Sequence, residues 1–339
     1  DEDTSLPITL TGSDVDGDGL TFSIGTGPSH GLLNGTIPNL TYTPGTDYNG
    51  SDSFTFKAND GTVDSALATI DITIDPVNDA PSFTAGASRF DLEDAAAVNI
   101  PGWATAISAG ADNESSQVLS FLITGNNNPG LFSSGPSVSP TGTLSYTLAA
   151  NANGIANITI VLMDDGGTDN GGDHDSDAQF FDITVTAVND PPSFTAGSSP
   201  VVDEDETSTT VTGWASNISP GPADESGQSV SFTFTRNNNP SLFSSGPSVN
   251  SSGDLTYSLV SNANGVANLQ VRAVDNGGTE NGGSNTSSVS AFSITVNAVN
   301  DPPVASNRFV DVDEDVPEPI TLTATDPEND PLTFSVVAE

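Results

Sequence analysis

The chain has 339 residues, of which 45 are Asp or Glu and only 5 are Lys or Arg, so its formal net charge is -40. A chain this acidic repels phosphate backbones and anionic lipid surfaces, which excludes nucleic-acid binding and disfavours membrane surfaces. It has no Cys, so disulfides and thiolate metal sites are excluded, and no apolar stretch reaches the ~18 residues of a membrane span. Because so many like charges strain one compact globule, composition favours bound cations, an elongated molecule or both.

Alternating apolar and polar residues predict short β-strands from the first 80 residues onward. The alternation runs at 54–58, at 70–74 and at 230–234, and each of these stretches places an apolar residue at every second position. Gly, Asn-Gly and Pro punctuate the chain every 8–12 residues, and no helical stripe is present. Several short strands in every ~80–110 residues predict β-sandwich domains. Trp103 and Trp214 fit such a sandwich as packing residues rather than sugar-stacking platforms.

Internal repeats divide the chain into four domains. The segment Val77-Asn78-Asp79-Ala80-Pro81 recurs with its Asn at positions 189 and 300, which are 111 residues apart each time. The two ends also match, since Asp1-Glu2-Asp3 corresponds to Asp313-Glu314-Asp315. We expect a short β-sandwich at 1–79, a longer one with elaborated loops at 80–190, the same repeat at 191–301, and the truncated start of a fourth domain at 302–339. The predicted fold is all-β, with tandem sandwiches forming an elongated rod, and we expect the chain to be part of a longer protein.

Acidic groups recur at equivalent places in each repeat. One pair stands near each repeat start, a second group follows the first strand, a third follows a late strand, and the fourth is the Asn-Asp of each linker. Carboxylate and amide oxygens with no cationic side chain nearby are ligands for hard cations. Ca²⁺ accepts six to eight oxygens in irregular geometry, Mg²⁺ demands a tighter octahedron, and zinc and copper prefer His and Cys. The sequence therefore predicts calcium sites, with a merely solvated acidic surface as the alternative.

The run from Asp14 to Gly19 also matches the start of an EF-hand loop. The twelfth position of that loop is Gly25 rather than Glu, and no helical pattern flanks it. An EF-hand is therefore rejected, while the calcium prediction stands.

The linker and its flanking motifs resemble those of cadherins. Residues 77–83, Val-Asn-Asp-Ala-Pro-Ser-Phe, are similar to the cadherin linker D-x-N-D-N-x-P-x-F, and the turns at 58–61 and 273–277 resemble its A-x-D-x-G turn. Residues 12–22 and 48–56 are typical of bacterial cadherin-like or Ig-like tandem repeats of large calcium-dependent surface adhesins. The resemblance implies Ig-like/cadherin-like β-sandwiches whose junctions share Ca²⁺.

This resemblance also implies which residues bind the ions. The first junction would use Glu2, Asp3, Asn78, Asp79, Asp112, Glu114 and Asp164. The second would use Glu93, Asp94, Asn189, Asp190, Asp224, Glu225 and Asp275. The third would use Glu204, Asp205, Asn300, Asp301, Asp326, Glu328 and Asp330, while Asp14, Asp16, Asp18 and Asp60 would serve a junction with a domain preceding residue 1. The middle repeats lack the D-x-D sequence of the family motif, so Asp112, Glu114, Asp224 and Glu225 depart from the family pattern.

The resulting functional hypothesis is a calcium-rigidified structural or adhesive segment of a giant extracellular cell-surface protein or fibre. Its partners would be neighbouring domains of the same chain, with possible homotypic, filament or glycan contacts. The alternatives are a carbohydrate- or self-binding adhesion module and a segment of a self-assembling extracellular filament; the loops at 126–129 and 168–172, with their copies, are candidate contact elements for these. We expect no enzyme, because only His30 and His174 exist, in unrelated contexts, and no phosphate loop, dinucleotide fingerprint or Ser-His-Asp set is present.

Overall fold

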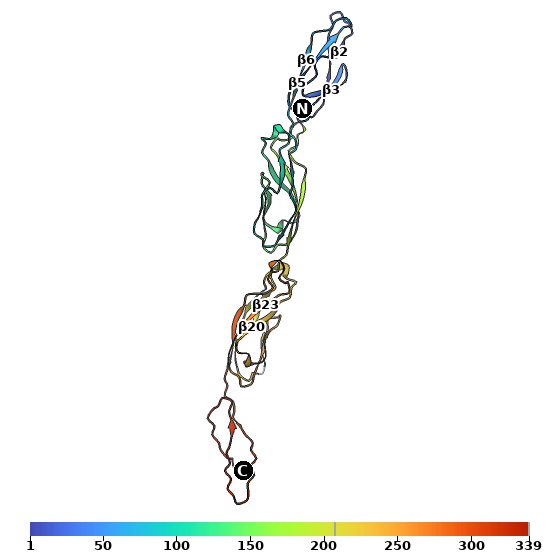
Figure 1. Cartoon of the computed structure of the whole chain (residues 1–339). Coiled ribbons are helices and arrows are strands. Elements are labelled where there is room, and N and C mark those ends of the chain that lie inside the picture. The colour runs from blue at the N-terminus through green and yellow to red at the C-terminus, as the bar shows by residue number, and fades with distance from the viewer. Residues whose placement is uncertain (207, 338–339) are drawn as a thin grey trace. The chain divides into compact units, whose positions relative to one another are not determined.

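The structure is a computed structural model that describes residues 1–206 and 208–337. Within these ranges the chain is all-β, with short 3₁₀ turns and no α-helix, which confirms the predicted fold class (Figure 1). The chain divides into two compact units, Asp1–Ala187 and Val188–Glu339, which are described separately. The proposed boundaries of the four repeats stay a prediction, and we use them below as names. No described helix is long and apolar enough to cross a membrane.

The first repeat, residues 1–79, forms two three-stranded antiparallel sheets with the orders β1-β4-β3 and β2-β5-β6. Side chains at alternate positions of both sheets meet in a core that includes Leu40, Tyr42, Phe54 and Ile72. The predicted alternations at 54–58 and 70–74 therefore lie in β5 and β6. The strand bounds are β1 Leu6–Thr9, β2 Thr21–Ile24, β3 Gly31–Thr36, β4 Asn39–Pro44, β5 Gly50–Asn59 and β6 Ala68–Ile74.

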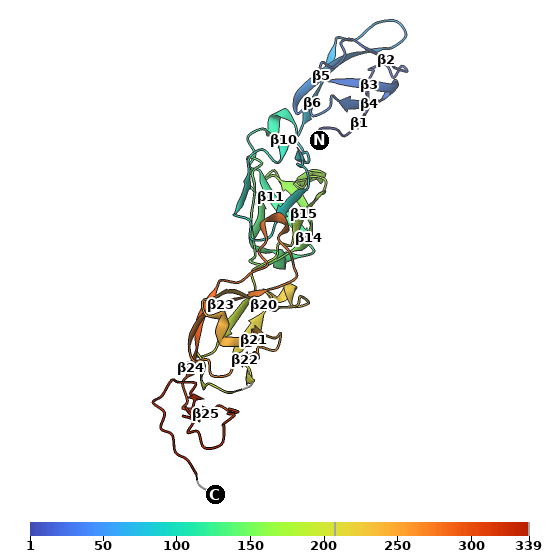
Figure 2. The ribbon, with the colours of Figure 1, turned by 60° about the horizontal axis from the view of Figure 1, so that its bottom comes forward.

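The second repeat, residues 80–190, packs a four-stranded sheet, β11-β14-β15-β8, against the smaller sheet β12-β13-β9. Figure 2 shows β11, β14 and β15 side by side, and β15 pairs in parallel with β8. Trp103 lies in the core against Phe181, as expected for a packing residue. The strands are β7 Ser82–Thr84, β8 Arg89–Leu92, β9 Val98–Ile100, β10 Thr105–Ser108, β11 Ser120–Asn126, β12 Phe132–Val138, β13 Leu144–Leu148, β14 Gly154–Met163 and β15 Gln179–Thr186. Three 3₁₀ turns lie at η1 Asp112–Glu114, η2 Pro129–Leu131 and η3 Asp169–Gly171.

The third repeat, residues 191–301, reproduces this plan strand for strand. Its four-stranded sheet has the order β17-β24-β23-β20, and its three-stranded sheet is β18-β22-β21. Trp214 packs on Phe292 at the position of Trp103. The strands are β16 Ser193–Ala196, β17 Val201–Asp203, β18 Thr209–Val211, β19 Ala215–Ser219, β20 Ser231–Asn237, β21 Phe243–Val249, β22 Leu255–Leu259, β23 Gly265–Val274 and β24 Ser290–Asn297, with the turns η4 Ala223–Glu225, η5 Pro240–Leu242 and η6 Glu280–Gly282.

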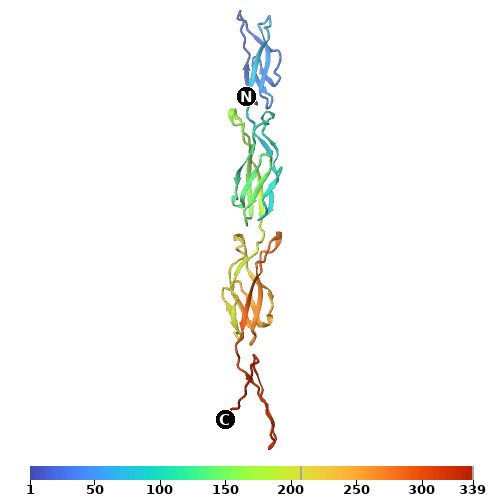
Figure 3. The same ribbon diagram turned by 90° about the vertical axis from the view of Figure 1, so that its left-hand side faces the viewer.

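The fourth segment, residues 302–339, contains two short paired strands, β25 Val304–Ala305 and β26 Ala324–Thr325. Figure 3 shows this red segment as a mostly irregular trace. Ile320 and Phe334 match strand residues of the first repeat, yet they are 59% and 51% exposed and lie outside strands. In the first repeat β1 pairs with β4 and β2 with β5, and residues 302–337 hold no counterpart of β4 or β5. Two strands alone bury too little apolar surface to make a sandwich.

Candidate metal centre

The start of the chain is tied to the first linker by Glu2. Its side chain is buried, and its two carboxylate oxygens accept from the backbone N–H of Val77 at 2.7 Å and from the amide of Asn49 at 3.3 Å. Its own backbone N–H donates to the carbonyl of Asp75 at 2.9 Å. Glu2 therefore joins the repeat start, the turn before β5 and the linker that follows β6.

Three carboxylates from distant parts of the sequence converge beside Glu2. Asp3, Asp47 and Asp79 each place one carboxylate oxygen within 4.8 Å of the others. Asp3 and Asp47 have positive φ angles of 58° and 54°, and the backbone N–H of Asp47 donates to the carboxylate of Asp3 at 3.3 Å. Within residues 1–206 and 208–337, no other three Asp, Glu or His side chains bring ligand atoms this close to one another.

The second repeat reaches this cluster through η1. Glu114 is buried and accepts from the backbone N–H of Asp79 at 2.9 Å, while its other oxygen accepts from Ala111 at 3.2 Å. Asp112, in the same turn, lines a hollow with Asp47. Burial, followed by repulsion from Asp47, Glu114, Asp3 and Glu2, raises the pKa of Asp79. Uncompensated negative charge thus collects where the first and second repeats meet.

Asn78 fastens the linker to the second repeat. Its amide donates to the Asp164 carboxylate at 3.0 Å and to the carbonyl of Asp173 at 2.7 Å, and it accepts from the amide of Gln117 at 2.7 Å. The backbone N–H of Asp173 donates in turn to the carbonyl of Asn78 at 2.9 Å. The side chain is thus fully engaged in holding the linker, and its predicted role as an ion ligand stays a prediction.

The second unit carries the same arrangement at the start of the third repeat. The amide of Asn189 donates to Asp275 at 3.0 Å and accepts from Gln228 at 2.8 Å. Glu225 is buried and accepts from the backbone N–H of Asp190 at 2.7 Å. Burial, together with repulsion from Asp190, Asp224 and Asp275, raises the pKa of Glu225, although the hydrogen bond from Asp190 opposes the shift. The linker geometry is therefore a repeated feature of the chain.

A related cluster surrounds Asp301, between the third repeat and the fourth segment. Its backbone N–H donates to the Glu328 carboxylate at 3.0 Å, and its carboxylate accepts from the Asn262 amide at 2.7 Å. The backbone N–H of Asn262 donates to Asp205 at 3.2 Å, and that of Val299 to Glu204 at 2.8 Å. Desolvation and then repulsion from Asp205, Glu328, Glu204 and Asp326 raise the pKa of Asp301.

The remaining predicted ligands lie in local turns. Asp14 accepts from the backbone N–H groups of Asp16 and Asp18, and Asp60 from those of Thr62 and Val63. Asp326 likewise accepts from Glu328 and Asp330. In the first unit, Glu93 accepts from the amide of Asn153 and Asp94 from the backbone of Asn151, as Glu2 and Asp3 do from Asn49 and Asp47. The Asn300 amide donates to the Asp301 carbonyl.

Asp47 is a candidate ligand that the sequence analysis missed. It precedes the Asn49-Gly50 pair just as Asn151 and Asn262 precede Asn153-Gly154 and Asn264-Gly265. All three residues adopt positive φ and donate a backbone N–H to the second acid of the repeat start. Aligning the first repeat with the other two through this short motif would have identified Asp47.

The donor set fits a hard cation. One carboxylate oxygen of each of Asp79, Asp164, Glu225 and Asp275 is buried and has no hydrogen-bond partner among the described residues. Such an oxygen costs free energy unless a donor or a cation satisfies it. Neither Lys57 nor Arg89, the two cationic residues of the first unit, forms an ion pair with this junction. Oxygen-only ligands in irregular positions suit Ca²⁺ better than Mg²⁺ or Zn²⁺.

Comparison with known proteins agrees with this architecture. Residues 1–73 match the family model of a bacterial Ig domain (Big_9). Most of the first repeat is thus similar to a bacterial Ig domain. The match confirms the resemblance to bacterial Ig-like repeats. Comparison with curated proteins finds no similar sequence.

Among solved structures, the chain is similar to several cadherin ectodomain fragments. Mouse protocadherin-24 EC1-3 shares 18% identity over 86% of this chain and 92% of its own, with a TM-score of 0.46. Mouse cadherin-23 EC22-24 shares 20% identity over 86% of this chain and 90% of its own, with a TM-score of 0.48.

Proposed function

We propose that this chain is a calcium-dependent structural segment of an extracellular adhesion-type protein, in which ions bound between repeats hold neighbouring domains in place. The observation that carries the proposal is the convergence of Asp3, Asp47 and Asp79 within 4.8 Å, where the first and second repeats meet. Like charges at this spacing repel strongly unless a cation lies among them. Calcium would be held by Asp3, Asp47, Asp79 and the carboxylates of Glu2 and Glu114.

Side chains of the chain itself hold the two repeats and their linker together. Glu2 ties the start of the first repeat to the linker, and Glu114 of the second repeat receives the backbone of Asp79. Calcium supplies the positive charge that lets these acids remain ionised at close range. Because the ligands come from two repeats and their linker, occupancy opposes hinge motion at the linker. Occupancy also stabilises the folded chain, since the unfolded chain has no preformed site.

The proposed context is the outside of a cell, as a spacer within a large surface protein. Extracellular fluids supply the calcium that weak oxygen sites require, whereas the absence of Cys leaves the sandwiches without disulfide cross-links. We propose that calcium takes over the stabilising role that disulfides have in many small secreted domains.

Thermal unfolding in calcium, in magnesium and in chelator, all at matched ionic strength, tests this proposal. Calcium at millimolar concentration is expected to raise the melting temperature by several degrees, and magnesium by much less. The Asp79→Asn variant should melt at a higher temperature than the parent in chelator and at a lower temperature than the parent in calcium. It relieves repulsion in the chelator, so it melts higher there, and it loses a ligand, so it gains less from calcium.

Asp71→Asn is the matched control, because Asp71 is an exposed residue of β6 and its substitution removes the same charge. This control should respond to calcium like the parent chain. Equal melting of the parent in all three solutions would overturn the proposal. So would an Asp79→Asn variant that keeps the full response to calcium.

A further inference from the structure

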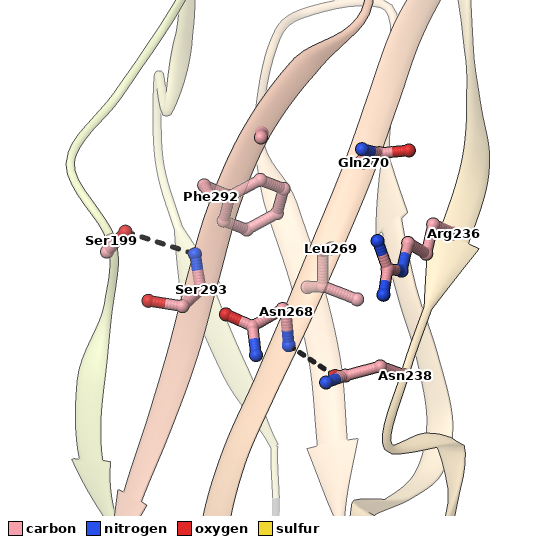
Figure 4. A pocket seen from close by; sticks show the side chains of 9 residues that line it. Ser199, Arg236, Asn238, Asn268, Leu269, Gln270, Phe292 and Ser293 are labelled. Atoms are coloured by element: carbon pink, nitrogen blue, oxygen red, sulfur yellow. Dashed lines mark hydrogen bonds between the residues drawn. The ribbon is translucent and has the colours of Figure 1, made fainter.

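The outer face of the four-stranded sheet in the third repeat carries a polar hollow of about 450 Å³. Its rim is formed by Arg236 and Asn238 at the end of β20, Asn268 and Gln270 of β23, and Ser293 of β24 (Figure 4). Its floor includes Leu269 and Phe292, which belong to the buried core. The hollow therefore combines a guanidinium group with three amides and a hydroxyl on a rigid sheet.

In the second repeat, the side chains at the corresponding positions bond to one another and close this face. There Asn127 donates to Asn157 at 2.6 Å, and Asn157 donates to Asp182 at 2.8 Å, so the side chains satisfy one another. Ser293 replaces Asp182 in the third repeat, 111 residues on. Among the described residues, the Asn268 side-chain amide has no hydrogen-bond partner, and the only bond kept from the second repeat's set is the one from the Asn268 backbone N–H to Asn238 at 2.6 Å, the counterpart of Asn157 to Asn127.

Three further replacements change the same place. Phe180, which is 74% exposed on β15, becomes Ala291, which removes a bulky side chain from the face. Gly125 becomes Arg236, and Thr159 becomes Gln270, at facing positions of β20 and β23. The third repeat has thus lost an apolar cover and gained a cation and an amide.

Arg236, the cationic residue at this site, forms no ion pair within the described part of the chain. The whole chain has five cationic residues, and Lys57 and Arg89 are paired with Asp64 and Asp91. Neither Arg236 nor Arg272, a further residue of β23, forms an ion pair with any described residue, although the chain has 45 acids. Two guanidinium groups on one sheet face without carboxylate partners point to an anion from outside the chain.

We propose that this hollow binds an acidic saccharide, with the sugar carboxylate on Arg236 and the sugar hydroxyls on Asn268, Gln270 and Ser293. Neutral donors and acceptors outnumber the cation at the rim, which matches a uronic acid with one carboxylate and several hydroxyls. A guanidinium binds a carboxylate through two parallel hydrogen bonds, which sets the orientation of the ring. The volume lies within the range of small-ligand sites. This inference is independent of the calcium proposal.

Calorimetric titration of the full chain with a trisaccharide of galacturonic acid, in calcium-containing buffer, tests the inference. The neutral galactose trisaccharide probes the hydroxyls alone, and a triglutamate peptide probes the charge alone. We expect the uronic trisaccharide to bind at least about tenfold more tightly than either, since a charge-assisted contact contributes roughly that factor.

The variants copy the second repeat, where each replacement is already part of a folded sandwich. Arg236→Gly should weaken binding about tenfold to a hundredfold, and Ala291→Phe should block the hollow. Both should retain the parent's calcium response, which separates failure of this site from failure of the calcium site. In the second repeat, Thr124→Ala serves as a control that leaves binding unchanged.

Four outcomes would overturn the proposal. These are no binding of the uronic trisaccharide, equal binding of the neutral sugar, equal binding of triglutamate, and full binding by Arg236→Gly. Sedimentation without sugar supplies one more check. Self-association that Arg236→Gly abolishes would assign the arginine to an acidic loop of a second copy instead.

Discussion

Asp52 shows how a single buried carboxylate organises the first repeat. It is 6% exposed and accepts hydrogen bonds from the backbones of Ser29 and His30 at 2.9 Å and from the hydroxyl of Tyr42 at 2.7 Å. These bonds tie the turn before β3 to β4 and β5. Burial alone favours the neutral acid, yet the combined hydrogen bonds lower the pKa of Asp52 well below its usual range.

Replacing Asp52 by Asn should therefore destabilise the first repeat. The amide cannot accept every bond that the carboxylate accepts, so buried donors lose partners, at a cost of about 2–3 kcal/mol. Hydrogen exchange of the full chain should show faster opening of β3 to β5, with the second and third repeats unchanged. The exposed Asp71→Asn is the control for charge. Unchanged protection in β3 to β5 would contradict this account.

The lowered pKa of Asp52 also fixes a direction for acid unfolding. The ionised Asp52 contributes fully to the free energy of unfolding above the ordinary carboxylate pKa of about 3.9, and this contribution is lost as the pH falls below that value. Acid should therefore destabilise the parent more than Asp52→Asn, and the two stabilities should converge at low pH. A constant difference down to pH ~2 would show that Asp52 does not titrate in this way.

Buried, hydrogen-bonded carboxylates such as Asp52 are the residues that sequence patterns identify least well. Extending the alternation of Phe54 and Phe56 by one step places Asp52 inward, but alternation assigns polar residues outward. The acidic pairs were found because they recur in every repeat. Asp47 was missed because its counterparts are Asn151 and Asn262, so the pattern in residue type is broken while the backbone geometry is retained.

At the scale of elements, the linker is held by a side-chain strap rather than by strand pairing. Asn78 bonds to Asp164, Gln117 and the carbonyl of Asp173, and Gly166 leaves the space that its amide oxygen occupies. A Cβ at Gly166 would overlap that oxygen. The sequence predicted a linker here from the repeated Val-Asn-Asp motif, but the strap needs contacts from three loops that no local pattern reveals.

Removing the strap should loosen the linker without unfolding the sandwiches. In Asn78→Ala, brief proteolysis of the native chain should cut within residues 76–80 several times faster than in the parent. The exposed Asn113→Ala, in the neighbouring turn η1, serves as a control for the loss of an amide. Equal cleavage rates in Asn78→Ala and the parent would show that the backbone bonds alone secure the linker.

One difference between the two junction clusters is the turn that holds Asp47 in the first repeat and Asn262 in the third. Asp47 adds a third carboxylate, whereas the Asn262 amide donates to Asp301 at 2.7 Å and occupies one of its oxygens. Calcium affinity rises with the number of charged ligands. The site at Asp79 should therefore bind calcium more tightly than the site at Asp301.

An exchange of these residues tests this ranking. Asp47→Asn should weaken the tighter of the calcium sites about tenfold, and Asn262→Asp should strengthen a weaker one by a similar factor. Calcium titration followed by calorimetry measures both. Asp254→Asn, on the turn before β22, supplies a control for charge in the third repeat. A shift in the opposite direction for either variant would refute the ranking.

At the scale of the whole molecule, repetition made the fold predictable. The 111-residue period, the alternation and the turn residues together indicated tandem all-β sandwiches, and the sheets confirm them. The saccharide site was not predictable, because it arises where the third repeat departs from the second. Ser293, Ala291 and Arg236 look like ordinary surface variation until cross-strand register places them on one face.

The net charge of -40 provides the last test, because it separates general repulsion from specific ion binding. Sodium chloride shortens the screening length from about 8 Å at 0.15 M to about 3 Å at 1 M. Acids that lie within 4.8 Å of one another are still only partly screened at the higher salt. In chelator, 1 M sodium chloride should therefore raise the melting temperature, but by clearly less than millimolar calcium does at low salt. If salt alone reproduced the whole calcium effect, the ions would act as a diffuse atmosphere, and the ordered junction would need no bound calcium.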